Sequence, residues 1–301
     1  MTGTTGTQER EAGAGTVGSA LEEAVRRLVA AGIDATTARA DARLLAAHAC
    51  GVGPDGLDGV SQTPAPAVLE EYVRRREERE PAELIVGHAW FMGHRFELAP
   101  GVFVPKPETQ EIVEEAINRL SGLLSRGKTS PLVVDLCAGP GTMAVTIARR
   151  VPDARVYGIE LSQVAAQAAR RNARGTAACI VQGDACEAFP EFDGCADLVV
   201  SNPPYIPIGL RTSAPEVLKY DPPLALWAGE SGLAMIRAME RTASRLLAPG
   251  GVLLLEHGGY QLESVPRLFR ETGRWSSAES RATCNDGMLV AVRGPAPSSG
   301  G

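Results

Sequence analysis

The sequence predicts an α/β protein in which a mostly parallel sheet, covered by helices on both faces, follows a small helical bundle. Two observations carry this prediction. From about residue 130 onward, short continuous apolar runs typical of buried strands alternate with amphipathic helical patterns. Before that, residues 17–80 carry the apolar spacing of helices.

The N-terminal bundle is expected to contain three helices. The first opens at Ser19, a suitable N-cap, and ends near Gly32. The three predicted ranges are 19–33, 34–51 and 66–80. Residues 81–105 then change character, with apolar and aromatic residues around Gly93, which predicts a hairpin linker between the bundle and the sheet.

The sheet and its helices are expected over residues 106–293. Strands are predicted at 131–136, 155–161, 178–184, 196–202, 252–258 and 287–294, and helices at 141–151, 162–175 and 232–251. In such sheets ligands bind at the carboxyl ends of the strands, where the strand order reverses. The residues that follow each strand are therefore the candidate site.

Charge and composition narrow the function classes. The formal net charge of −6 and a pI near 5.4 give no electrostatic signal for nucleic acid, so no direct nucleic-acid partner is expected. No apolar stretch is long enough to span a bilayer and the N-terminus lacks a signal core, which predicts a cytoplasmic protein with no membrane partner. The polar ends, residues 1–16 and 294–301, are expected to be disordered tails.

Cysteine and histidine spacing gives no metal signal. The six cysteines contain no C-x-x-C pair, and the four histidines show no H-x-x-x-H spacing. Neither a metal site nor a disulfide framework is expected, and reduced thiols fit a cytoplasmic protein.

Three predicted strand ends describe a nucleoside pocket. Gly139 and Gly141 lie in the first loop, "DLCAGPG", where glycine lets a ligand approach the main chain and the next helix offers free N–H groups. Glu160 ends the second strand and is suited to accept hydrogen bonds from ribose hydroxyls. Asp184 ends the third strand and is placed to reach the adenine. The glycine spacing alone does not separate NAD from S-adenosylmethionine.

The fourth strand ends in Asn202-Pro203-Pro204-Tyr205, which indicates a reaction at a planar nitrogen. The Asn202 side-chain oxygen and the Pro203 carbonyl can accept two N–H groups and stabilise positive charge that develops on the nitrogen. The two prolines fix the backbone, and Tyr205 offers a flat ring against a planar substrate. No strong general base is required. Asn202, Pro203 and Tyr205 are the candidate catalytic residues.

These motifs together resemble the class I, Rossmann-like methyltransferases, and most closely the release-factor glutamine N5-methyltransferases (the HemK/PrmC family). The resemblance runs from about residue 17 to 293 and includes "VPKPET", "DLCAGPG", "GIEL" and "SNPPYIP". It implies methyl transfer from S-adenosylmethionine to the glutamine of the Gly-Gly-Gln loop of peptide-chain release factors, with the bundle docking this protein partner. We expect a monomer.

By position, the resemblance assigns a cofactor set and a substrate set. The cofactor set comprises Cys137, Ala138, Gly139, Pro140, Gly141, Glu160, Asp184 and Asn202. The substrate set comprises Asn202, Pro203, Pro204 and Tyr205.

Three positions depart from the family pattern. Cys137 stands where the loop usually begins with glycine, and Pro140 stiffens that loop; a positive φ at Cys137 would be strained. Ala185 replaces a frequent aromatic partner for adenine. Lys106 replaces a common arginine, so a point charge takes the place of a planar bidentate donor.

Four other readings stay open from the sequence. A glutamine in a ribosomal protein, or an exocyclic adenine nitrogen in nucleic acid, could be the methyl acceptor. A nucleotide-dependent oxidoreductase would leave the Asn-Pro-Pro-Tyr run unexplained. A non-catalytic binding module would treat Cys137 and Ala185 as signs of a decayed cofactor pocket.

Overall fold

A computed structural model describes residues 15–210 and 214–295. The described residues fall into two compact units that divide between Val86 and Gly87. Most of the two predicted tails, residues 1–14 and 296–301, lies outside the described residues.

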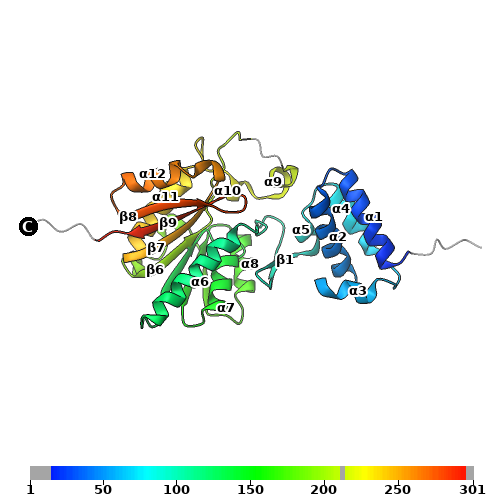
Figure 1. The fold of residues 1–301 in the computed structure, drawn as a ribbon, viewed down its shortest axis with the longest axis horizontal. Helices are drawn as coiled ribbons and strands as arrows, with labels where there is room; N and C mark the ends of the chain where they lie inside the picture. The colour runs from blue at the N-terminus through cyan, green and yellow to red at the C-terminus, as the bar shows by residue number, and fades with distance from the viewer. Residues whose placement is uncertain (1–14, 211–213, 296–301) are drawn as a thin grey trace, which may run out of the picture. The chain divides into compact units, whose positions relative to one another are not determined.

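The N-terminal unit is helical (Figure 1). Its helices are α1 (Val17–Ala30), α2 (Ala35–Ala49), η1 (Pro54–Gly56), α3 (Leu57–Val60), α4 (Val68–Glu77) and α5 (Ala82–Val86). The N-cap of α1 is Thr16, whose hydroxyl accepts from the Ser19 amide, so the prediction of Ser19 as the cap is wrong by one turn. The core of this unit includes Leu28 and Leu45, both fully buried.

The second unit begins with a hairpin, β1 (His88–Phe91) and β2 (His94–Glu97), which confirms the hairpin expected around Gly93. A seven-stranded sheet follows in the order β5-β4-β3-β6-β7-β9-β8. Its strands are β3 (Leu132–Leu136), β4 (Arg155–Glu160), β5 (Ala178–Gln182), β6 (Ala196–Ser201), β7 (Leu247–His257), β8 (Trp275–Ala282) and β9 (Gly287–Arg293). β3 to β7 pair in parallel, whereas β9 pairs antiparallel with both β7 and β8. The predicted mostly parallel sheet is confirmed.

Helices cover both faces of this sheet (Figure 1). They are α6 (Thr109–Ser125), α7 (Thr142–Arg150), α8 (Gln163–Asn172), α9 (Pro215–Tyr220), α10 (Pro223–Leu226), α11 (Ala234–Leu246) and α12 (Ser264–Glu271), with short 3-10 turns at 185–187, 190–192 and 259–261. Along β3, Leu132, Val134 and Leu136 join one core cluster with α11 and α12. Val133 faces the opposite cluster with α6 and α7. This alternation follows from the two-residue period of a strand.

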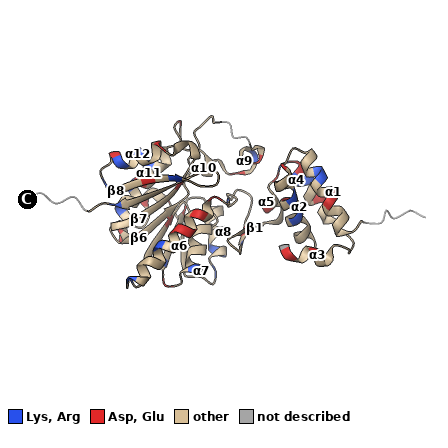
Figure 2. Cartoon of the chain, in the orientation of Figure 1, with Lys and Arg blue, Asp and Glu red and all other residues tan. Residues whose placement is uncertain are grey.

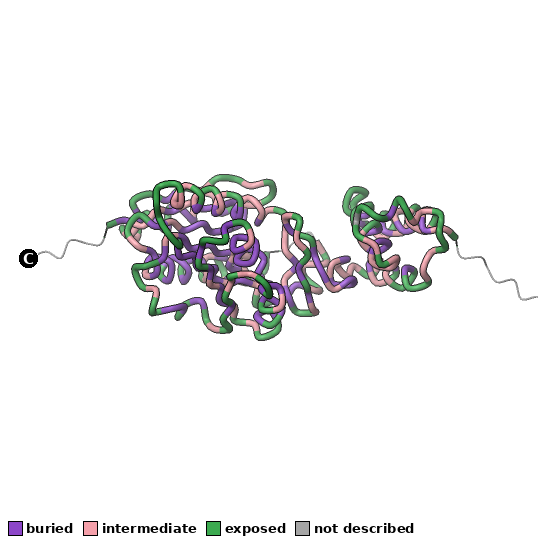
Figure 3. Tube along the Cα trace, turned by 90° about the horizontal axis from the view of Figure 1, so that it is seen from below, coloured by how far each residue is buried: buried purple, intermediate pink, exposed green. Residues whose placement is uncertain are grey.

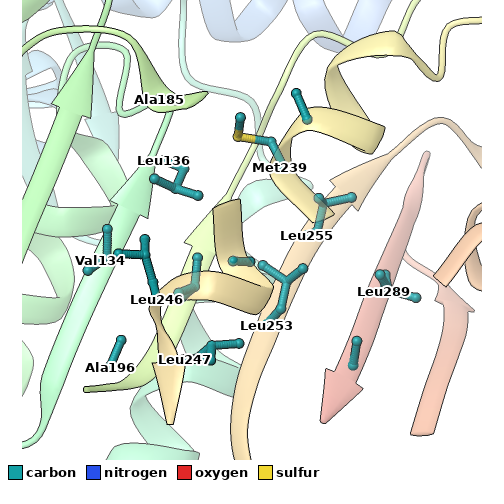
Figure 4. Close-up of a cluster of buried hydrophobic side chains, with 14 of the residues drawn as sticks. Val134, Leu136, Ala185, Ala196, Met239, Leu246, Leu247, Leu253, Leu255 and Leu289 are labelled. Atoms are coloured by element: carbon teal, nitrogen blue, oxygen red, sulfur yellow. The ribbon is translucent and has the colours of Figure 1, made fainter. Parts of the chain in front are cut away.

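Burial matches this layered arrangement. Figure 3 shows buried segments in the interior of the larger unit and exposed segments around them. Figure 4 shows Leu136, Leu255 and Met239 within the cluster that lies under α11.

Several details differ from the sequence prediction. The helix expected over 232–251 ends at Leu246, because residues from Leu247 onward already belong to β7. The elements that were not predicted are β8 and the helices α3, α5, α6, α9, α10 and α12; α5 occupies the start of the range predicted as the hairpin linker. Ser162, by contrast, caps α8 as expected, since its hydroxyl accepts from the Ala165 amide.

Charge is mixed over the helices. Figure 2 shows acidic and basic residues on the same elements, for example on α6 and α12. Among the described residues, no helix has the length and apolarity to cross a bilayer. Within the same residues, no cluster of His, Cys, Asp and Glu has the arrangement of a metal site.

Candidate active site

The candidate site lies where the strand order reverses. The chain runs outward from β3 through β4 to β5, then returns to the other side of β3 as β6. Leu136 of β3 is in register with Ser201 of β6, and the Ser201 hydroxyl donates to the Leu136 carbonyl at 2.7 Å. The loops that begin at Cys137 and Asn202 therefore leave the sheet side by side, as the topology rule predicts.

An open cavity occupies this position, with about 1080 Å³ of empty space that includes its mouth to solvent. Its lining combines the ends of β3 to β6 with two segments outside the sheet. The described lining residues are Gly101, Phe103, Pro105, Thr109, Cys137, Ala138, Gly139, Pro140, Thr142, Met143, Ile159, Glu160, Leu161, Ser162, Ala165, Asp184, Ala185, Asn202, Pro204, Pro222, Leu224, Ala225 and Met235.

The glycine-rich loop has the conformation that its residues require. Gly139 and Gly141 have φ values of 56° and 83°. A Cβ built on Gly139 meets no protein atom within 4 Å, so the cavity reaches the main chain there. A Cβ on Gly141 would lie 3.1 Å from the Ala169 Cβ, so Gly141 also permits close packing of α8.

Cys137 has a positive φ, the conformation that would strain a residue other than glycine at this position. Its φ is 66°, in the left-handed region that costs a non-glycine residue about 1–2 kcal/mol. The thiol is 3.9 Å from the Met239 sulfur, and burial raises the pKa of Cys137. Cys137 is therefore a packed, neutral wall of the cavity and not a nucleophile.

Glu160 is held by the main chain on both of its oxygens. Oε2 accepts from the Gly139 amide and Oε1 from the Ser162 amide, each at 2.8 Å. Burial raises the pKa of Glu160, and these hydrogen bonds oppose the rise. Each oxygen keeps a further lone pair for a ligand hydroxyl.

Asp184 lines the same side of the cavity. Its Oδ1 accepts from the Cys186 amide at 2.8 Å. The neighbouring Ala185 also lines the cavity, without an aromatic face for adenine. A carboxylate held for a ribose, a second carboxylate and a glycine loop open to the cavity fit an adenosine-containing cofactor.

Asn202 is oriented by a short chain of hydrogen bonds. Its Nδ2 donates to the Thr109 Oγ1 at 3.3 Å, and that hydroxyl donates to the Glu256 Oε2 at 2.7 Å. Because Nδ2 is directed at Thr109, Oδ1 is the polar atom that Asn202 offers to the cavity. Burial raises the pKa of Glu256 to about 7, and the Thr109 hydrogen bond opposes this rise.

The Tyr205 hydroxyl is tied to two carboxylates. Among the described residues, the cavity lining includes Pro204 but neither Pro203 nor Tyr205. The Tyr205 hydroxyl is 3.1 Å from the Asp286 Oδ2 and 3.4 Å from the Glu256 Oε1, and burial and these carboxylates raise its pKa. These contacts anchor the ring beside the cavity, and its support of a planar substrate stays a prediction.

The main chain after Tyr205 is fixed from several sides. The Tyr205 carbonyl accepts from the Tyr260 hydroxyl at 2.9 Å and from the Gln261 Nε2 at 3.3 Å. A Cβ on Gly232 would lie 2.3 Å from that carbonyl, so this close approach requires glycine. These contacts fix the position of the main chain at the end of the Asn-Pro-Pro-Tyr run.

Two segments outside the sheet complete the cavity. The Ile206 amide donates to the Leu226 carbonyl, and the Ala228 amide donates to the Ile206 carbonyl, both at 2.9 Å. These bonds hold Pro222, Leu224 and Ala225 over the cavity. Phe103 and Pro105, which precede α6, form the other wall, so this half of the cavity is apolar.

Sequence reasoning found only part of this second half. The loop at 206–223, which includes Pro222, is expected from the sequence to help enclose the substrate. Phe103 and Leu224 were missed, because nothing in their local pattern marks them. Glu256 did carry a signal, because it is an acidic residue inside the apolar run "VLLLEHG". A charge in a buried strand requires a partner or a function.

Comparison with known proteins agrees with this geometry. A methyltransferase domain model matches residues 133–214, and a PrmC N-terminal domain model matches residues 19–87. The chain is 73% identical over 282 residues to the 4-amino-L-phenylalanine/4-methylamino-L-phenylalanine methyltransferase of Streptomyces pristinaespiralis, covering 94% of this chain and 97% of that protein. It is 44% identical over 267 residues to the release factor glutamine methyltransferase of Streptomyces coelicolor, covering 88% and 93%.

Among solved structures, the T. thermophilus 16S rRNA N2 G1207 methyltransferase, in complex with AdoMet and guanosine, matches with a TM-score of 0.50. The two chains are 23% identical, and the match covers 68% of this chain and 49% of that one. A likeness at this identity supports the fold alone.

Proposed function

Because the chain belongs to the PrmC family of S-adenosylmethionine-dependent methyltransferases, we propose that it methylates the aromatic amino group of 4-amino-L-phenylalanine. The observation that carries this proposal is the 73% identity, over nearly the full length of both chains, to a methyltransferase of that substrate. The release-factor relative is 44% identical.

The chemistry of the two substrates explains how one site serves both. A glutamine amide and an arylamine each have a planar nitrogen whose lone pair is delocalised, into a carbonyl in one and into a ring in the other. Each therefore needs its N–H groups held so that the lone pair faces the methyl donor. The Asn-Pro-Pro-Tyr run meets this need for any such nitrogen.

The residues of this chain position the arylamine in three ways. Asn202 Oδ1, oriented through Thr109, accepts one N–H. The Pro203 carbonyl stays the predicted acceptor of the other N–H, although Pro203 itself is not among the described lining residues. The apolar wall of Phe103, Pro105 and Leu224 receives the benzene ring. S-adenosylmethionine supplies an electrophilic methyl group, and Gly139, Glu160 and Asp184 are the residues proposed to hold it.

No general base is needed after the transfer. An arylammonium ion is far more acidic than an alkylammonium ion, because loss of the proton restores conjugation with the ring. The proton therefore leaves to water through the open mouth of the cavity. No lysine or histidine is among the described lining residues.

A second methylation follows from the same geometry. The name of the 73% identical relative includes both the 4-amino and the 4-methylamino substrate. After one transfer the nitrogen keeps one N–H, so one of the two acceptors is sufficient. The new methyl group needs apolar space. The half of the cavity lined by Phe103, Pro105, Pro222, Leu224 and Ala225, the substrate half, offers this space.

The release-factor glutamine predicted from the sequence is the second candidate. It is favoured by the match of residues 19–87 to the PrmC N-terminal domain and by the 44% identical relative. In this case the helical unit would dock the release factor, as the sequence predicts.

The test is direct. The purified full-length protein is incubated with S-adenosylmethionine and 4-amino-L-phenylalanine, and the products are separated and weighed by mass spectrometry. We expect products heavier by one and then two methyl groups, both on the aromatic nitrogen. Absence of any methylated arylamine would reject the proposal.

A further inference from the structure

Glu256 is a buried glutamate close to the predicted methyl-acceptor position. Ser201 of β6 is in register with Leu255 of the parallel strand β7, so Asn202 and Glu256 follow them at the same edge of the sheet. Glu256 is 2% exposed and is not among the described residues that line the cavity. An ionisable side chain buried in an apolar strand is costly, so its contacts indicate its role.

The Thr109 hydroxyl stands between Glu256 and the Asn202 amide. Thr109 lines the cavity, and its Oγ1 is 2.7 Å from the Glu256 Oε2 and 3.3 Å from the Asn202 Nδ2. A hydroxyl has one proton and two lone pairs, whereas an ionised carboxylate offers acceptors alone. The hydroxyl therefore donates its proton to Glu256 and keeps its lone pairs for the Asn202 Nδ2.

This direction of the hydrogen bonds decides which end of the Asn202 amide faces the cavity. With Nδ2 held by Thr109, Oδ1 is free to accept an N–H of the incoming nitrogen. A hydroxyl without a fixed partner for its proton could equally donate to Oδ1, and the amide would then present Nδ2 to the cavity. Nδ2 is a donor, so it would oppose the N–H groups of the methyl acceptor.

The second oxygen of Glu256 faces other acidic groups. Oε1 is 3.4 Å from the Tyr205 hydroxyl, whose closer partner is the Asp286 Oδ2 at 3.1 Å. Burial raises the pKa of Glu256 to about 7, and the charges of Asp286 and Glu108 add to this rise. Because Oε2 already accepts from Thr109, a proton bound to Glu256 belongs on Oε1. Oε2 therefore accepts from Thr109 in both charge states.

We propose that Glu256 is a positioning residue for methyl transfer, which takes the Thr109 proton and so holds the Asn202 amide with Oδ1 toward the methyl acceptor. This inference rests on the proposed function and adds to it a residue that acts through Thr109 without touching the substrate. The same arrangement serves an arylamine and a glutamine amide, because both present N–H groups to Oδ1.

The test compares two replacements of similar length with 4-amino-L-phenylalanine as substrate. Glu256→Gln keeps an acceptor: the new amide nitrogen can donate to the Tyr205 oxygen, whose proton goes to Asp286, and the new amide oxygen then accepts from Thr109. Glu256→Met has no acceptor. We expect kcat to stay within about twofold for Glu256→Gln and to fall about 5- to 10-fold for Glu256→Met, the effect of one lost hydrogen bond. The KM for S-adenosylmethionine should change little in either variant.

A double variant shows whether Glu256 acts through Thr109. Thr109→Val breaks the same chain of hydrogen bonds, so Glu256→Met combined with Thr109→Val should lose no more than about 5- to 10-fold in kcat. Two independent roles would instead multiply to a loss of about 25- to 100-fold.

Thr146→Val is the matched control for the loss of the Thr109 hydroxyl. Thr146 lies in α7 and is fully buried, and its hydroxyl has no hydrogen-bond partner among the described residues. It is also not among the described residues that line the cavity. We expect kcat to stay within about twofold of that of the unaltered protein.

Separate outcomes overturn separate claims. Equal losses for Glu256→Gln and Glu256→Met, or a multiplied loss in the double variant, would reject the positioning role while the proposed function stands. Glu256→Leu gives the same comparison if circular dichroism shows that the methionine variant does not fold. No methylated arylamine from the unaltered protein would reject the proposed function, and the same variants would then be compared on the release-factor glutamine.

Discussion

The two halves of the cavity are built in different ways. The cofactor half is made of strand ends. There the Glu160 carboxylate accepts hydrogen bonds from the main-chain amides of Gly139 and Ser162, both at 2.8 Å. The substrate half is made of segments outside the sheet. Leu224 there is 52% exposed although it lines the cavity.

This difference bears on how each half tolerates change. Altering the cofactor half would disturb the parallel register that positions β3, β4 and β6. The described segments of the substrate half lie outside that register and are tied to the sheet unit by contacts such as those of Ile206. Relatives of one fold with an arylamine and a glutamine substrate are consistent with this division.

Asn202 joins the two halves, so its loss has the largest expected effect. Asn202→Ala removes the acceptor that stabilises charge on the nitrogen, and we expect kcat to fall about 10²–10³-fold. Circular dichroism and S-adenosylmethionine affinity by calorimetry should stay close to those of the unaltered protein. Loss of secondary structure would instead make Asn202 a structural residue.

Glu256 accepts a hydrogen bond from Thr109, and its ionisation is expected to affect the free energy of unfolding. Its pKa is raised from 4.5 to about 7 in the folded protein, so between these values the unfolded chain binds fewer protons. The contribution of Glu256 to stability is therefore present below pH 4.5 and lost as the pH rises through 7. Relative to the unaltered protein, Glu256→Gln should gain about 3 kcal/mol in free energy of unfolding between pH 4.5 and pH 8.

Urea unfolding of both proteins at several pH values measures this gain. A difference that does not change with pH would mean that the pKa of Glu256 is not raised in the folded protein.

Glu160 tests the role of the cofactor half of the cavity. Glu160→Ala should raise the KM for S-adenosylmethionine about 10- to 100-fold, because hydrogen bonds to a charged group are lost. The KM for the arylamine should change little. An unchanged KM for S-adenosylmethionine would remove Glu160 from the ribose role.

Thr109 tests the orientation of the Asn202 amide and has the smallest expected effect. Thr109→Val removes the hydroxyl that accepts from Nδ2, and we expect kcat to fall about 5- to 10-fold from the loss of one neutral hydrogen bond. Thr109→Ser keeps the hydroxyl and should recover most of the rate. Equal rates for the valine and serine variants would show that the hydroxyl does not matter.

The sequence predicted the cofactor half because its residues follow strand ends. Gly139, Glu160 and Asp184 meet at one edge of the sheet, and this follows from parallel pairing alone. The sequence left open whether Cys137 is strained or only packed, and its φ of 66° decides for strain. These predictions depend on local pattern and on one topological rule.

The substrate half could not be predicted in the same way. Phe103 and Leu224 reach the cavity through irregular segments, whose paths depend on tertiary hydrogen bonds such as those of Ile206. Within the motif, the position of the Tyr205 ring depends on Asp286, 81 residues away, which accepts a hydrogen bond from the Tyr205 hydroxyl. The release-factor substrate is what the family resemblance implies, whereas the Asn-Pro-Pro-Tyr run itself indicates only a planar nitrogen.

One measurement tests the central claim most directly. The full-length protein is given S-adenosylmethionine with a labelled methyl group, together with equal concentrations of 4-amino-L-phenylalanine and an unmethylated release factor. Label in the small-molecule fraction, with little in the protein fraction, is the result that we predict. Label on the Gly-Gly-Gln glutamine, with none on the arylamine, would contradict it.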